Sequence, residues 1–382
     1  MADLRPFPGI RYSPSLVGDL GAVVAPPYDV IPEADLAGYR ARSPHNVVRL
    51  IRPGDDYAGA AATLDEWARE GVLLEDPVPA LYLHEVDFEG ATRRDLIGAV
   101  RLQDYADGVV LPHELTHRGP KEDRLALLRA TATSLEPLWF LYEGAGSPIG
   151  GLLAEAAMPA PTLAFAGPDA QHRFWVLTDR DLLGTLRTAF AFETLLIADG
   201  HHRYETALAY AGEVSGARDA SSRFTLALLT AMDDPGLRVL PTHRVMKAGI
   251  KVTGGEASAS LDEVVAAIRG RVAAGHYRVG SFEVLPLEGE VAVLELHRQV
   301  IDNILGRRSA EEALLYTRDA PEAVRWVDEG RGVAAFLLDA PPLRQVLKLA
   351  REGTALPQKS TYFHPKPPSG MVFMGLDPNL QL

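Results

Sequence analysis

Residues 194–206 have the sequence Thr-Leu-Leu-Ile-Ala-Asp-Gly-His-His-Arg-Tyr-Glu-Thr, in which two patterns meet. The first five residues form an apolar run of the length expected for a buried strand. The residues from Tyr204 to Gly212 have a helical composition, so the polar residues between the two stretches lie where a strand passes into a helix. This strand–turn–helix unit favours a mixed α/β fold.

The turn of this unit gathers the groups of an anion site. Free backbone N–H groups and the positive dipole end of a helix lie at its first turn, and Gly200 lets the backbone approach a phosphate closely. His201, His202 and Arg203 add donors, of which the arginine fork suits phosphate oxygens. Asp199 is expected to stay ionised beside them, as a hydroxyl-activating base or a metal ligand. A capped helix with surface histidines is the plainer alternative.

Apolar and amphipathic stretches on both sides of the turn predict further elements. We expect strands at 80–86, 95–102, 138–142, 174–177, 224–230 and 291–296, and helices at 57–70, 123–133, 181–190 and 261–272. The predicted regions are an N-terminal α/β region (1–145), a Gly/Ala/Pro-rich linker or surface crossing (146–170), a core with the Asp-Gly-His-His-Arg box (171–245), a smaller α/β unit (246–345) and a tail that returns to the site (346–382). The expected fold class is therefore mixed α/β (α+β), with mixed sheets.

Composition narrows the classes of partner. The 382 residues include 38 Lys+Arg and 51 Asp+Glu, so the formal net charge is −13, which argues against nucleic acid and anionic membranes as partners. The chain has no cysteine, which excludes disulfides, thiolate nucleophiles and Cys-ligated metal sites. Neither a signal peptide nor a membrane span is evident, so we expect a cytoplasmic protein. The sequence does not indicate an oligomeric state.

Residues 113–117, His-Glu-Leu-Thr-His, match the H-E-x-x-H pattern of zinc peptidases. That chemistry needs the motif inside a helix, whereas Pro112 precedes it and Gly119-Pro120 follows it closely. A zinc hydrolase that uses His113, Glu114 and His117 is one alternative, and a polar loop with no ligand role is another. The third is an anion-handling loop.

Cations follow two of these motifs. Lys121 and Arg124 come shortly after the H-E-x-x-H stretch, and Lys359-Ser-Thr-Tyr-Phe-His-Pro-Lys366 adds cations and hydroxyls near the end of the sequence. Taken alone, the second motif is typical of a solvated basic segment.

The common phosphate-binding and kinase motifs, including the P-loop, are missing, so a phosphotransferase with this sequence would use an uncommon scaffold.

Several motifs, in their order along the chain, resemble the large prokaryotic family numbered 1015 among the domains of unknown function. They are Val24-Ala-Pro-Pro-Tyr-Asp-Val-Ile, Asn46-Val-Val-Arg-Leu, His113-Glu-x-Thr, Pro120-Lys-Glu-Asp-Arg, Ile197-Ala-Asp-Gly-His-His-Arg-Tyr-Glu-Thr-Ala, Pro241-Thr-His-Arg and Lys359-Ser-Thr-x-Phe-x-Pro-Lys. The resemblance covers nearly the whole chain. Because the family pattern does not require His117, it disfavours the zinc interpretation.

Asp-Gly-His-His-Arg also resembles the phosphate-binding box of ParB/sulfiredoxin-like proteins, which bind nucleotide phosphates at a helix start. Free-serine kinases of that fold carry a similar box. The resemblance implies a ParB/sulfiredoxin-like core and phosphorylation of free L-serine to O-phosphoserine, with pyrophosphate, ATP or ADP as donor. The implied partners are a small phosphate-bearing ligand and an amino-acid acceptor.

The function expected from the residues and the resemblance together is a small-molecule phosphotransferase, in which charge neutralisation and positioning dominate. The predicted phosphate-binding residues are Gly200, His202, Arg203, Lys121, Arg124 and Lys359, and the predicted catalytic residues are Asp199, Glu114 and His201. His113 and Thr116 are predicted to contact substrate, and Mg²⁺ is expected on Asp199 or Glu114. A regulator that binds phosphate or nucleotide without turnover is the alternative from another class.

Overall fold

The computed structural model describes residues 1–114, 118–167, 170–214, 216–247, 252, 254–302 and 313–382. Contacts along the chain divide it into two units. The first unit comprises Met1–Pro112, Thr116–Leu237 and Pro365–Leu382, and the second comprises His113–Leu115 and Arg238–His364. The second unit is thus inserted in the sequence of the first, and each is described separately below.

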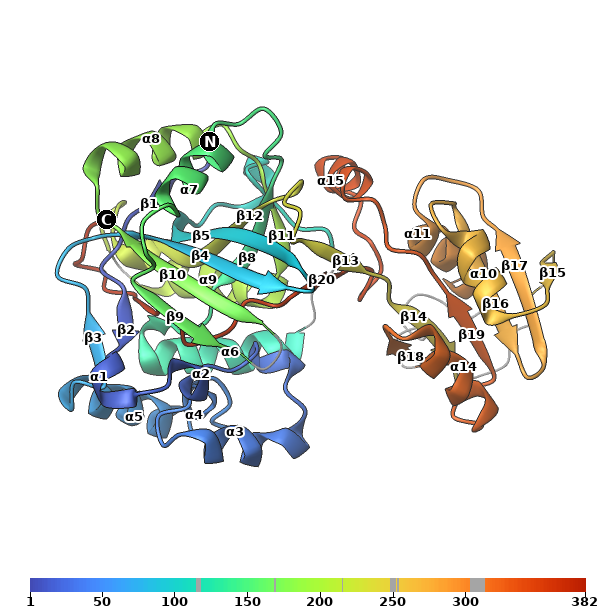
Figure 1. Ribbon diagram of the computed structural model, residues 1–382, viewed down its shortest axis with the longest axis horizontal. Helices are drawn as coiled ribbons and strands as arrows, with labels where there is room; N and C mark the ends of the chain where they lie inside the picture. The colour runs from blue at the N-terminus through green and yellow to red at the C-terminus, as the bar shows by residue number, and fades with distance from the viewer. Residues whose placement is uncertain (115–117, 168–169, 215, 248–251, 253, 303–312) are drawn as a thin grey trace. The chain divides into compact units, whose positions relative to one another are not determined.

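A nine-stranded mixed sheet forms the centre of the first unit (Figure 1). Its strands follow the order β6-β11-β8-β12-β5-β4-β10-β9, and β1 pairs with β5. Their bounds are β1 Leu4–Arg5, β4 Leu81–Phe88, β5 Ala91–Arg101, β6 Val110–Leu111, β8 Leu138–Tyr142, β9 Leu163–Ala166, β10 Gln171–Leu177, β11 Leu195–Asp199 and β12 Phe224–Ala231. The sheet joins strands from the predicted N-terminal region to strands of the predicted core, so the units differ from the predicted boundaries.

Helices and two short ribbons complete the first unit. The helices are α1 Pro14–Val17, α2 Leu20–Val23, α3 Leu36–Arg42, α4 Val48–Ile51, α5 Tyr57–Arg69, α6 Arg118–Thr131, α7 Ile149–Ala156, α8 Arg180–Phe190 and α9 His201–Glu213, with 3-10 turns at Tyr28–Val30, Glu33–Asp35, Tyr105–Asp107 and Ser221–Arg223. The ribbons pair β2 Ile10–Tyr12 with β3 Leu73–Glu75, and β7 Thr133–Ser134 with β21 Met374–Gly375. Helix α6 packs against both α5 and α9.

One face of the large sheet is an apolar core. Alternate residues of the strands, such as Leu81 and Leu83 on β4, pack with Leu186 and Phe190 of α8 and with Ile149 of α7. This arrangement follows from the period-2 alternation of side chains along a strand. Helix α7 and strand β9 thus occupy much of the segment that was expected to be a linker or a surface crossing.

The intervening residues of the same strands form a buried polar row. In order across β10, β4, β5, β12 and β8, the row consists of His172, His84, Asp95, Thr230 and Trp139. The ring nitrogens of the two histidines are 3.0 Å apart, and His84 Nδ1 is 3.0 Å from the Asp95 carboxylate. Thr230 donates to Asp95 at 2.5 Å and accepts from Trp139 Nε1 at 2.8 Å. The row therefore joins five adjacent strands through side chains as well as through the backbone.

Arg93 supplies the countercharge of this row. Its guanidinium is fully buried, donates to both oxygens of Asp95, and lies 4.4 Å from the centre of the Trp139 ring. It also donates to the carbonyl of Pro365, which returns to the first unit after the inserted segment. Burial alone would raise the pKa of Asp95, but Arg93 and His84 outweigh it and lower the pKa to about 2.

The second unit contains a six-stranded antiparallel sheet in the order β15-β17-β16-β19-β14-β18. Its strands are β14 His243–Met246, β15 Glu256–Ser258, β16 Ala273–Arg278, β17 Ser281–Pro286, β18 Leu314–Thr317 and β19 Ala334–Leu337, and a ribbon pairs β13 Arg238–Leu240 with β20 Tyr362–His364. The helices are α10 Leu261–Ile268, α11 Ala292–Leu296, a π-helical turn at His297–Ile301, α14 Ala320–Asp328 and α15 Leu343–Arg351. Residues of α10 and α14 pack with the strands in a small core.

The mixed α/β class with several sheets is confirmed. The strand expected at 291–296 is wrong, because residues Ala292–Leu296 form helix α11. This stretch, Val-Ala-Val-Leu-Glu-Leu, is a short apolar run, and periodicity alone cannot distinguish a buried strand from a buried helical turn. Val293, Leu294 and Leu296 are all buried in the helix that forms there.

Candidate functional site

Gly200 makes the turn from β11 into α9. It has φ 97° and ψ 29°, in the left-handed region that favours glycine. A Cβ atom at this position would come within 2.6 Å of Leu138 Cδ2 and 3.1 Å of a terminal nitrogen of Arg203. Gly200 is the N-cap residue of α9 and has no side chain with which to cap the helix. The tight turn therefore begins a 13-residue helix whose N-cap residue makes no side-chain hydrogen bond to the first backbone N–H groups.

Asp199, the last residue of β11, pairs with two cations. Arg203 Nη2 lies 2.6 Å from Asp199 Oδ2, and Lys366 Nζ pairs with Oδ1. All three side chains are only 11–12% exposed. Burial alone would raise the pKa of Asp199, but Lys366 and Arg203 lower it below its ordinary value. Asp199 is therefore an ionised, buried carboxylate with one cation on each oxygen.

A second contact fixes Arg203. Its Nη1 donates to the carbonyl of Pro137 at 2.8 Å, in the turn that leads into β8. Burial acts to lower the pKa of Arg203, and the carboxylates of Glu136, Asp199 and Asp29 raise it above its ordinary value. The guanidinium is thus held between two strands, with its charge maintained.

The sequence analysis predicted Asp199 and Arg203 as site residues, but it did not assign a role to Lys366. Lys366 was quoted only as the end of the Lys359-Ser-Thr motif. Asp199 lies next to Trp139 in the β11–β8 register, and the Lys366 ammonium is 5.9 Å from the centre of the Trp139 ring. The buried row across the large sheet thus ends beside Asp199 and Lys366.

Two further carboxylates, Asp29 and Glu136, act electrostatically on Arg203 and were also not predicted. The backbone N–H of Tyr28 donates to Glu136 Oε1 at 2.9 Å, as does the hydroxyl of Ser369 at 3.0 Å. The side chain of Asp29, in the 3-10 turn Tyr28–Val30, reaches solvent. Desolvation by the surrounding protein and the negative charge of Asp199 raise the pKa of Asp29 to about 6. The Ala-Pro-Pro-Tyr-Asp motif was the available signal for this residue.

Asp29 gives the protein a testable pH dependence. Because its pKa rises from 3.8 to about 6 on folding, the folded state binds this proton more tightly than the unfolded chain. Its contribution to stability is therefore present at low pH and is lost between about pH 4 and pH 6. We expect Asp29→Asn to remove this decline from a plot of unfolding free energy against pH. Asp35→Asn, at an exposed aspartate, is the control, and an unchanged slope in Asp29→Asn would contradict the assignment.

Lys121 and Arg124 lie on α6 and pair with residues of the first unit. Lys121 Nζ pairs with Glu205 of α9. Arg124 is 7% exposed, donates to the carbonyl of Ile51 at 2.8 Å and pairs with Asp123 at 2.6 Å. Its guanidinium carbon lies 4.1 Å from the centre of the Tyr28 ring, and Tyr28 in turn bonds to Glu136. Arg124 thus adjoins the Asp29–Glu136 region.

The two histidines of the box occupy the first turn of α9. His201 is buried, and its electrostatic interaction with Asp199 is among the influences that lower the pKa of Asp199. The backbone carbonyl of His202 accepts a hydrogen bond from the Thr206 hydroxyl at 2.8 Å. Their roles in phosphate binding remain predictions.

His113, Glu114 and Lys359 belong to the second unit. His113 Nε2 is 2.8 Å from the Thr361 hydroxyl, and Glu114 accepts from the backbone N–H of Ser360 at 2.9 Å. Lys359 has φ 52°, and its ammonium lies 5.0 Å from the centre of the Tyr316 ring. These contacts hold the segment 359–361 against Glu114, and the predicted catalytic and substrate roles of these residues remain untested.

The H-E-x-x-H stretch is only partly described. Glu114 forms a β-bridge with Leu356, and neither His113 nor Glu114 lies in a helix. Thr116 and His117 lie outside the described residues. Within the described part of the chain, no group of three or more His, Asp or Glu side chains could hold a metal ion.

Among the described helices, none combines the length and the apolarity needed to cross a membrane.

Comparison with known families gives one decisive match. A family described as "Protein of unknown function (DUF1015)" matches residues 4–328, which is more than half of the chain. The chain belongs to this family. The resemblance inferred from the motifs is therefore confirmed for the family, while the ParB-like phosphate box remains a prediction. A comparison with curated proteins found no match.

Similar solved structures are distant. A free serine kinase in complex with AMP shares 15% identity with a TM-score of 0.39, over 67% of this chain and 83% of that chain. A conserved hypothetical protein from Pyrococcus furiosus shares 15% identity with a TM-score of 0.39, over 69% and 90%. SbnI from Staphylococcus aureus, truncated at its C-terminus, shares 10% identity with a TM-score of 0.38, over 70% and 82%. At these values the structures assign no role to any residue of this chain.

Proposed function

We propose that the protein is a small-molecule phosphotransferase and that its reaction is the phosphorylation of free L-serine to O-phosphoserine. The observation that carries the proposal is the buried Asp199, which holds Arg203 and Lys366 beside the N-terminus of α9. Phosphoryl transfer needs cations and backbone donors fixed before the substrate arrives, more than it needs covalent chemistry. This proposal rests on the site and not on the distant solved structures.

Arg203 keeps donors beyond those that bond to Asp199 and Pro137. An arginine has five N–H groups, and the contacts of Arg203 to Asp199 and Pro137 use its two terminal nitrogens. Low exposure strengthens any further charge-assisted hydrogen bond. We therefore assign the donor phosphates to Arg203 and Lys366, together with the backbone N–H groups that follow Gly200.

The neighbouring carboxylates determine how such a site can accept an anion. Asp29 and Glu136 raise the pKa of Arg203 by their negative charge, so an added phosphate would meet a region in which carboxylates already offset the charges of Arg203 and Lys366. A proton on Asp29 or a divalent cation would restore the balance. Mg²⁺ bound together with the phosphates is therefore part of the proposal.

Asp29 is the proposed proton acceptor for the serine hydroxyl. Both oxygens of Asp199 are engaged by cations, whereas the Asp29 side chain reaches solvent and its pKa of about 6 suits acid–base chemistry near neutral pH. Asp199 then acts by positioning Arg203 and Lys366. The remaining predicted residues keep their predicted roles in the proposal. They are His113, Glu114, Thr116, Lys121, Arg124, His201, His202 and Lys359.

The proposal is tested by product formation. We expect protein incubated with Mg²⁺, L-serine and ATP, ADP or pyrophosphate to form O-phosphoserine, detected by ³¹P NMR and mass spectrometry. Asp29→Asn should lower the rate by about 100-fold or more, because general-base catalysis contributes factors of about 10²–10⁴. The absence of O-phosphoserine with all three donors would refute the kinase.

Binding without turnover is the second candidate function. The specific observation in its favour is the engagement of both Asp199 oxygens, since that carboxylate is not available as a base. Calorimetric binding of a nucleotide or pyrophosphate without any product would select this alternative.

A further inference from the structure

A cavity lies between α9, α6 and the segment that links α6 to β8. One face of α9 lines it with Arg203, Thr206, Ala207 and Tyr210, which recur at the helical spacing of three and four residues. The cavity has a volume of about 60 Å³. One enclosed water molecule needs roughly 10–15 Å³, so there is room for more than one water.

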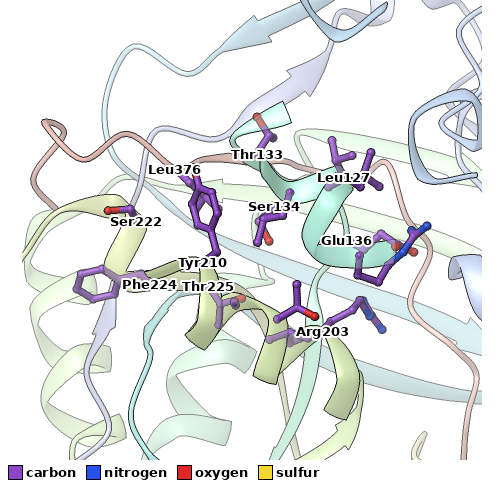
Figure 2. A pocket seen from close by; sticks show the side chains of 16 residues that line it. Leu127, Thr133, Ser134, Glu136, Arg203, Tyr210, Ser222, Phe224, Thr225 and Leu376 are labelled. Carbon is purple, nitrogen blue, oxygen red and sulfur yellow. The ribbon is translucent and has the colours of Figure 1, made fainter. Parts of the chain in front are cut away.

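The two ends of this cavity differ in character. Arg203 and Glu136 line one end, and Ser222, Phe224 and Leu376 line the other, as Figure 2 shows. The lining as a whole is largely apolar and includes Leu127, Leu128, Leu135, Leu138 and Ala207. A ligand that matches this lining needs an anionic part, a flat apolar part and polar atoms at its far edge.

Ser222 provides an independent observation at the far end. The residue is 1% exposed, and its hydroxyl has no hydrogen-bond partner among the described residues. Buried hydroxyls normally have partners, so one that lacks them beside a cavity indicates a missing polar group. Thr225, 3% exposed, contributes a second hydroxyl to the same lining.

We propose that this cavity binds the base of a nucleoside phosphate whose phosphates contact Arg203. A nucleobase has apolar faces for the leucine walls and for Tyr210 or Phe224, and its edge carries donors and acceptors for Ser222 and Thr225. Pyrophosphate would leave the apolar walls unused, and serine is a charged zwitterion. The inference rests on the proposed phosphate site and selects a nucleotide over pyrophosphate as its ligand.

Calorimetric titration of the full chain with ADP and with pyrophosphate, both with Mg²⁺, tests the inference. We expect ADP to bind at least 10-fold more tightly than pyrophosphate. Ala207→Leu fills the cavity and should lower ADP affinity to that of pyrophosphate, while pyrophosphate affinity changes by less than 2-fold. Ala209→Leu, on the exposed face of the same helix, is the matched control and should bind both ligands as the wild type does.

Each outcome bears on the inference. Equal losses for both ligands in Ala207→Leu, or unchanged ADP affinity in the folded variant, would overturn the base site and leave the phosphate site standing. Binding of neither ligand to the wild type would overturn both. If Ala207→Leu does not fold, Ser222→Ala serves instead, because it removes only a buried, unpartnered hydroxyl. It should weaken ADP and not pyrophosphate, and unchanged ADP affinity would count against the proposal.

Discussion

Arg203→Lys is expected to lower the rate of phosphotransfer by about 100-fold or more, because it removes one fixed hydrogen-bond donor at a developing anion. If the protein binds its ligand without turnover, we expect a loss of ligand affinity instead. Arg203 contacts Asp199 and the Pro137 carbonyl at the same time through separate nitrogens. A lysine has one ammonium on a flexible stem and cannot reproduce that planar geometry. The substitution therefore keeps the charge and removes the fixed orientation.

The matched control is Arg129→Lys. Arg129 also lies in an ion pair between α6 and α9, with Glu213 at 2.5 Å, but its side chain is 54% exposed. We expect that variant to keep both its affinity and its rate. Thermal unfolding of both proteins separates loss of function from loss of fold, and wild-type kinetics in a folded Arg203→Lys protein would remove Arg203 from the site.

Asp95→Asn is expected to lower the free energy of unfolding by about 3–5 kcal/mol, the usual result of removing one partner from a buried ion pair. Asp95 is fully buried and accepts from Arg93, Thr230 and, through the imidazole contact, His84. Asparagine leaves the buried guanidinium of Arg93 without a countercharge. Its amide also places a donor where the carboxylate only accepts.

Urea denaturation followed by far-UV circular dichroism measures this effect. Asp219→Asn is the control, since Asp219 also pairs with arginines but is 44% exposed, where ion pairs contribute about 0–1 kcal/mol. A loss below about 1 kcal/mol in Asp95→Asn, comparable to such a surface pair, would contradict the interpretation of the row as a stabilising network.

The sequence allowed the strand–turn–helix unit at Asp199 to be predicted, because its signals are local. An apolar run, a glycine and a helical composition follow one another there, and β11 and α9 form as expected. The helix starts at His201 rather than Tyr204, since Gly200 already completes the turn. Local patterns could not show that Asp199 pairs with Lys366, which lies 167 residues away.

The buried polar row was missed for a different reason. In β4 the sequence Leu-Tyr-Leu-His-Glu-Val places a polar residue on each face, so its pattern does not indicate that both faces are buried. In the structure both faces of this strand are covered, and His84 is fully buried. Whether a face of a strand is exposed to solvent depends on which other segments pack against it. Here one such segment contains Pro365, which is distant in the sequence and does not affect the local pattern of β4.

The pairing of Lys366 with Asp199 also has a consequence for protein synthesis. At translation rates of about 5–20 residues per second, the 167 residues from Gly200 to Lys366 take roughly 8–33 s to add. Throughout that interval a nascent chain can hold β11 and α9 with Arg203 as the single cation on Asp199. The complete cationic pair arises only after residue 366 has been added, so a ribosome-bound chain is expected to lack ligand-binding competence until synthesis has passed that point.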